Sequence, residues 1–155
     1  MSALKETIRA DLTAAMKARD SMVTGTLRMA LAAITNEEVA GSQAKQLSDA
    51  DVLRVLAREV KKRNESAEVY AGAGRPELAD NERAEVEVLS AYLPRQLTDD
   101  ELTAVVQQAL AEVQGDSAEA PTMRQMGQVI KAANAMAAGR ADGARVASAV
   151  KTALG

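Results

Sequence analysis

The organisation of this chain depends on the stretch Leu93-Pro94-Arg95-Gln96-Leu97-Thr98-Asp99-Asp100-Glu101. Pro94 disfavours helical geometry in the residue before it, so the upstream helix must stop near Tyr92. Thr98 and Glu101 follow the capping-box pattern, a hydroxyl and then a glutamate three residues later, which marks the start of a helix. The sequence therefore predicts a boundary here, with one domain over residues 1–93 and a second over residues 94–155.

Four helices are predicted upstream of this boundary, over residues 2–18, 20–41, 48–72 and 76–92. Each has an apolar stripe at helical spacing. Ser2, Asp20 and Ser48 are good N-caps, and Pro76 suits the first turn of the fourth helix. Glycines at the ends of the second and third provide natural stops. Residues 1–93 are therefore expected to form a four-helix lobe.

Three more helices are predicted downstream, over residues 98–115, 122–138 and 142–154. Gly115 ends the first of them, and an acidic loop through Pro121 leads to the second. No segment of the chain alternates apolar and polar residues in the way a strand does. The sequence therefore predicts an all-α protein, in which an N-terminal four-helix lobe is followed by a small three-helix bundle.

The composition excludes several classes of catalytic site. The 155 residues include no cysteine and no histidine, which rules out thiolate nucleophiles, cysteine–zinc sites, imidazole metal sites and Ser-His-Asp catalysis. Glu82, Glu85 and Glu87 crowd the fourth helix, but they alternate with valines and are expected to face water. We therefore predict a protein without a catalytic centre, a metal or a cofactor.

The apolar residues are spread through short stripes. No run approaches the roughly 18–20 residues that a membrane helix needs, and the first residues contain no apolar signal core. We expect no membrane association and a location in the cytoplasm.

Charge is unevenly distributed beyond Pro94. Residues 94–121 carry one base and six acids, a net charge of −5, whereas residues 122–155 carry five bases and one acid, a net charge of +4. The five bases are Arg124, Lys131, Arg140, Arg145 and Lys151. This segment could lie along a phosphate backbone, or it could neutralise the acidic helix beside it. Both interpretations stay open at this point.

A second basic group lies on the third predicted helix, and it consists of Arg54, Arg58, Lys61, Lys62 and Arg63. Glu59 precedes Arg63 by four residues, the spacing of an ordinary intrahelical ion pair. Arg54, Arg58, Lys61 and Lys62 share one face of this helix, which could contact nucleic acid, but a solvated face is the better interpretation of the group.

The turn Gly139-Arg140-Ala141-Asp142-Gly143 is predicted to end one helix and begin the next. Gly139 suits a left-handed C-cap, Asp142 suits an N-cap, and Gly143 would allow a close approach of neighbouring atoms. These roles leave Arg140 unexplained, and its planar fork can reach a phosphate.

Gly127 is unusual because it lies inside a predicted helix, where glycine costs about 1 kcal/mol relative to alanine. A backbone contact should compensate for this cost. We expect that contact to be a neighbouring helix, with a ligand as the alternative.

Several of these motifs resemble the YqeY-like, or GatB/YqeY, family. They are Tyr92-Leu93-Pro94-Arg95-Gln96-Leu97-Thr98-Asp99-Asp100-Glu101-Leu102, Met126-Gly127-Gln128-Val129-Ile130-Lys131 and Gly139-Arg140-Ala141-Asp142-Gly143. The resemblance implies an N-terminal helical lobe joined to a bundle similar to the tail domain of the B subunit of the glutamine-dependent tRNA amidotransferase. In that enzyme the tail contacts the tRNA body, and the chemistry occurs in a separate domain. One departure is that the family usually has a proline and lysines where this chain has Asn134-Ala135-Met136-Ala137-Ala138.

The leading hypothesis is a non-catalytic accessory protein that binds tRNA or another structured RNA, with an aminoacyl-tRNA-handling enzyme as a further partner. Arg140 and Lys131 are the expected principal phosphate contacts, supported by Arg145, Lys151 and Arg124. The alternatives are a protein-interaction adaptor and a component of a glutamine-dependent tRNA amidotransferase, the latter by family association only.

Overall fold

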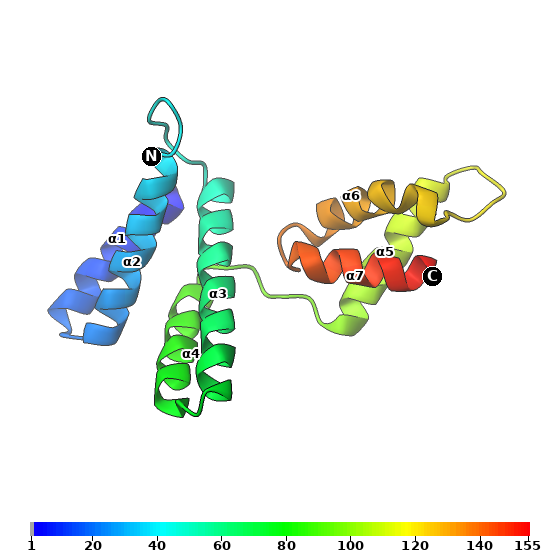
Figure 1. Ribbon diagram of the computed structural model, residues 1–155. Helices are drawn as coiled ribbons and strands as arrows, with labels where there is room; N and C mark the ends of the chain where they lie inside the picture. The colour runs from blue at the N-terminus through cyan, green and yellow to red at the C-terminus, as the bar shows by residue number, and fades with distance from the viewer. Residues whose placement is uncertain (1) are drawn as a thin grey trace. The chain divides into compact units, whose positions relative to one another are not determined.

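A computed structural model describes residues 2–155, and their contacts divide the chain after Leu93 (Figure 1). We call the two parts the N-terminal unit, which ends at Leu93, and the C-terminal unit, which begins at Pro94. The described residues form helices and no strand, which confirms the all-α prediction. None of these helices is both long and apolar enough to cross a membrane.

The N-terminal unit contains α1 (Ala3–Lys17), α2 (Ser21–Glu38), α3 (Asp49–Gly72) and α4 (Pro76–Ser90). The C-terminal unit contains α5 (Asp99–Gln114), the 3₁₀ turn η1 (Met123–Gln125), α6 (Met126–Ala137) and α7 (Gly143–Leu154). The sixth predicted helix therefore begins as a 3₁₀ turn, and the second ends at Glu38, before the predicted glycine stop.

Side-chain caps start several helices where the sequence predicts them. The hydroxyl of Ser2 accepts from the Lys5 amide, and the carboxylate of Asp20 accepts from the Val23 amide. Thr98 and Glu101 each accept from the other's backbone amide at 3.1 Å, which completes the predicted capping box. Such caps satisfy amides that have no partner inside the helix.

The core of the N-terminal unit draws on all four of its helices. Its largest buried side chains are Ile8, Leu27, Ile34, Leu56 and Leu89. In α1 the small side chain of Ala15 is buried as well, whereas its neighbour Met16 is exposed. The hydroxyl of Tyr92 donates to Asp11 at 2.5 Å and joins the end of α4 to α1.

Arg63 corrects two sequence predictions. It was expected on a solvated face, but only 3% of the residue is exposed. Its Nη1 lies 3.1 Å from Glu59 on α3, and its Nε donates at 2.9 Å to Glu85 on α4. Glu85 therefore faces Arg63 and not open water, because a buried guanidinium needs anionic partners.

The core of the C-terminal unit is built from small side chains. Its fully buried residues include Val106 and Ala109 of α5, Val129 and Ala133 of α6, and Val146 and Val150 of α7. Leu97, which precedes α5, is also buried in this cluster. The core therefore extends beyond the three helices into the non-helical segment of the C-terminal unit that precedes α5.

Candidate nucleic-acid interface

The turn between α6 and α7 reverses the chain through two left-handed residues. Ala138 caps α6 with a φ of 50°, and Gly139 follows with a φ of 79°. The C-cap thus falls one residue before the predicted glycine. Glycine adopts this region without strain, but alanine does not. Asp142 caps α7 by accepting from the Ala144 amide at 3.4 Å. A side chain at Gly143 would meet no atom within 4 Å, so the expected close approach is absent.

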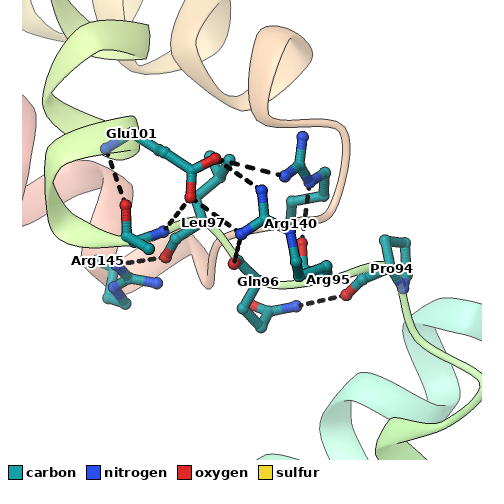
Figure 2. A network of polar contacts seen from close by, with 8 residues as sticks. Pro94, Arg95, Gln96, Leu97, Glu101, Arg140 and Arg145 are labelled. Carbon is teal, nitrogen blue, oxygen red and sulfur yellow. Dashed lines mark hydrogen bonds and ion pairs between the residues drawn. The ribbon is translucent and has the colours of Figure 1, made fainter.

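Arg140 in this turn and Arg145 in α7 both donate hydrogen bonds to the segment that precedes α5 (Figure 2). Arg140 donates through Nε to the carbonyl of Arg95 at 2.9 Å, and its own carbonyl accepts from the Leu97 amide at 2.7 Å. Arg145 donates through Nη2 to the carbonyl of Leu97 and to Asp99, both at 3.0 Å. Pro94 begins the C-terminal unit, and its carbonyl accepts from the side chain of Gln96. Arg140, which the caps left unexplained, thus has a structural contact.

Glu101 is the anionic centre of this network (Figure 2). Its two carboxylate oxygens accept from Nη1 and Nη2 of Arg95 at 3.0 and 2.7 Å. The Arg95 guanidinium, together with the amide and hydroxyl of Thr98, lowers the pKa of Glu101 to about 2. Glu101 is therefore ionised at neutral pH, and each of its carboxylate oxygens already accepts a hydrogen bond from Arg95.

The Arg140 side chain is held by one hydrogen bond, but its terminal amino groups form no further hydrogen bond of normal length with the described residues. Its Nη2 lies 3.8 Å from Glu101, which is an ion-pair distance and too long for a hydrogen bond. The side chain is 36% exposed. Because the Nε–H is held by the Arg95 carbonyl, the guanidinium is fixed in place while its terminal amino groups keep the capacity to bind an anion.

The other three predicted phosphate contacts differ from Arg140 and Arg145 in their exposure and their ion pairing. Arg124 on η1, Lys131 on α6 and Lys151 on α7 are exposed. Within residues 2–155 no ion pair involves any of these three side chains. The two interpretations of the basic segment therefore apply to different residues: Arg140 and Arg145 pair with acids of α5, whereas Arg124, Lys131 and Lys151 do not.

Gly127 lies on the exposed surface of α6. A Cβ added there would meet nothing within 4 Å, so the neighbouring helix that we expected to compensate for this glycine is absent. The structure thus provides no intramolecular reason for glycine at this position.

A groove between α5 and α7 was not predicted from the sequence. Its volume is about 400 Å³, and the residues that line it include Leu102, Val106 and the ion-paired Asp99 and Arg145. Thr103, Gln107, Ser148 and Thr152 line it with neutral hydrogen-bonding groups. No local pattern could reveal it, because its two walls, α5 and α7, are separated in the chain by the whole of α6.

Comparison with known proteins gives a match to the family described as Yqey-like protein over residues 5–154. An uncharacterized protein of Schizosaccharomyces pombe is 37% identical over 92 residues, which are 59% of this chain and 72% of that protein. Two proteins named altered inheritance of mitochondria protein 41, mitochondrial, are also similar. The one from Meyerozyma guilliermondii is 27% identical over 125 residues, 79% of this chain and 65% of its own length. The one from Clavispora lusitaniae is 32% identical over 91 residues, 59% of this chain and 52% of its own length. From its match over residues 5–154, the chain belongs to the YqeY-like family.

Proposed function

We propose that this protein binds tRNA or another structured RNA through its C-terminal unit and catalyses no reaction itself. The observation that carries the proposal is the exposure of Arg124, Lys131 and Lys151 without an ion pair among the described residues. Residues 122–155 contain a single acid, Asp142, which caps α7. Unpaired cations of this kind displace counterions from a polyanion, and this displacement is the main source of non-specific affinity for nucleic acid.

The proposed mode of recognition is contact with the RNA backbone and shape. Both aromatic residues of the chain, Tyr70 and Tyr92, lie in the N-terminal unit, so the C-terminal unit has no ring on which an unpaired base could stack. Structured RNA is recognised largely through its backbone and its 2′-hydroxyls, which need no aromatic residue.

Arg140 has a specific place in this proposal. The bond from its Nε to the Arg95 carbonyl fixes the guanidinium before any ligand arrives, which reduces the entropy lost on binding. Its terminal amino groups can then take a phosphate as a planar fork. Because Glu101 is already bound by Arg95, Arg140 need not break a short ion pair to do so.

The proposal also assigns RNA binding to one of the two units. We propose that they are domains, a four-helix lobe and a three-helix bundle, and that RNA binding belongs to the bundle. The resemblance to the tail domain of the tRNA amidotransferase B subunit supports this assignment, because that tail contacts the tRNA body. An amidation reaction would require a catalytic partner.

The test is a titration of the whole chain with total tRNA across a salt series, monitored by electrophoretic mobility. The variant Lys131→Ala/Lys151→Ala should lower the slope of log affinity against log salt by about 1.8, if each lysine neutralises one phosphate. The matched control is Lys17→Ala/Lys45→Ala, which removes two exposed lysines of the N-terminal unit and should leave the slope unchanged.

Two results would contradict the proposal. One is the absence of tRNA binding by the intact chain at low salt. The other is an equal loss of affinity in both double variants, which would mean that only the net charge of the chain matters and that the C-terminal unit has no special part.

A further inference from the structure

Gly127 stands out from the glycines that the fold itself requires. Gly139 adopts a positive φ that alanine would resist, whereas Gly127 is the second residue of α6 and does not have a positive φ. A Cβ at Gly127 would meet no atom within 4 Å and would point into open space. The chain therefore has glycine in a helix, where its conformational freedom is unfavourable, at a position where packing would accept a larger residue.

The neighbours of Gly127 on the helix surface are the unpaired cations. Lys131 lies four residues later, which places it beside Gly127 on the same face of α6. Arg124 lies three residues earlier, in the 3₁₀ turn that leads into the helix. Asn134, a further turn along this face, is exposed as well. A bare stretch of helix backbone is thus flanked on both sides by cationic side chains without ion pairs.

We propose that Gly127 is the point at which the sugar–phosphate backbone of the bound RNA lies directly against α6. Arg124 and Lys131 hold the phosphates on either side of this contact. This inference rests on the proposed function and adds a specific position to it. The physical reason is that a residue without a Cβ lets a ligand approach the helix backbone more closely than any side chain would permit.

The proposal makes an unusual prediction for Gly127→Ala, because stability and binding should move in opposite directions. Alanine favours the helix and meets no clash, so the C-terminal unit should melt about 2–8 °C higher. The added methyl group keeps the RNA backbone away from the helix, so the affinity for tRNA should fall about tenfold, the effect of losing one charge-assisted contact. A glycine with a structural role would lose stability and affinity together.

Gly25→Ala is the matched control. Gly25 is also an exposed helical glycine, in α2, and a Cβ there likewise meets nothing within 4 Å. This variant should stabilise the N-terminal unit in the same way and leave the affinity for tRNA unchanged. The measurements are calorimetric melting of the whole chain and the tRNA titration, carried out on the parent and on both variants.

The outcomes separate the two proposals. If the parent chain binds no tRNA, the proposed function and this inference both fail. If the parent binds and Gly127→Ala binds equally well, only the inference fails, because the RNA backbone then does not lie against α6 at Gly127. If Gly127→Ala melts lower than the parent, glycine is required by the fold and the inference is overturned. A higher melting temperature with weaker tRNA binding, absent in Gly25→Ala, is the result expected.

Discussion

Replacing Arg63 with alanine should destabilise the N-terminal unit by about 2–4 kcal/mol. Arg63 is 3% exposed, pairs with Glu59 on its own helix and joins α3 to α4 through its ion pair with Glu85. Removing the guanidinium leaves both carboxylates without their partner. The unit must then solvate or bury two uncompensated negative charges at a helix–helix contact.

The magnitude follows from how far water can reach these carboxylates. Breaking a buried ion pair by removing one partner typically costs 3–5 kcal/mol. The side chains of Glu59 and Glu85 are 17% and 27% exposed, so water partly replaces the guanidinium and reduces the cost. The loss of the apolar stem of Arg63 acts in the other direction, because it leaves a gap between the helices.

The assay is urea denaturation followed by tyrosine fluorescence. Tyr70 and Tyr92 both lie in the N-terminal unit, so this signal reports its unfolding and not that of the C-terminal unit. With an m-value of about 1–2 kcal/mol/M, the midpoint should fall by roughly 2 M. Arg58→Ala is the control: its side chain is 63% exposed and pairs with Glu37, so the variant should lose under about 1 kcal/mol.

The Arg63→Met variant separates charge from packing. Methionine keeps much of the apolar stem but pairs with neither carboxylate, so it should recover only a small part of the lost stability. Full stability in Arg63→Met, or a loss below about 1 kcal/mol in Arg63→Ala, would refute the argument that the buried charge contacts hold α3 and α4 together.

Two further predictions concern the C-terminal unit. The Arg95 guanidinium lowers the pKa of Glu101 from an ordinary 4.5 to about 2, so its stabilising effect is complete above pH 4.5 and is lost as pH falls toward 2. Glu101→Gln should therefore flatten the loss of stability in this window, monitored by circular dichroism during acid titration. Ala138→Gly should raise stability by about 1 kcal/mol, because it relieves a left-handed alanine. Ala135→Gly, on the exposed face of α6, should lower it by about 1 kcal/mol, and the same sign for both changes in calorimetry would contradict this reasoning.

The features that the sequence predicts well depend on residues close to one another in the chain. Thr98 and Glu101 cap α5 across three residues, and Asp20 caps α2 across three. Their hydrogen bonds are geometrically possible as soon as the local turn forms, so composition and spacing are sufficient to identify them. The same holds for the all-α fold, which follows from helical periodicity in each segment.

The features that the sequence does not predict depend on distant residues. Arg63 meets Glu85 22 residues later, and Arg140 meets the Arg95 carbonyl across 45 residues. Local spacing paired Arg63 only with Glu59 and left Arg140 without a structural role. The sequence alone cannot distinguish Arg145 from Lys151 among the predicted RNA contacts, because both count as one positive charge. In the structure Arg145 pairs with Asp99, whereas Lys151 is exposed.

The buried position of Leu97 affects where the chain can be cut. Helix α5 begins at Asp99, and a fragment that starts there would contain every helix of the C-terminal unit. It would nevertheless lack a core side chain, the capping hydroxyl of Thr98 and the carbonyls that accept from Arg140 and Arg145. A fragment that starts at Pro94 retains all of them. A fragment that keeps the contacts of the C-terminal unit is therefore bounded by hydrogen bonds to an irregular segment and not by the ends of its helices.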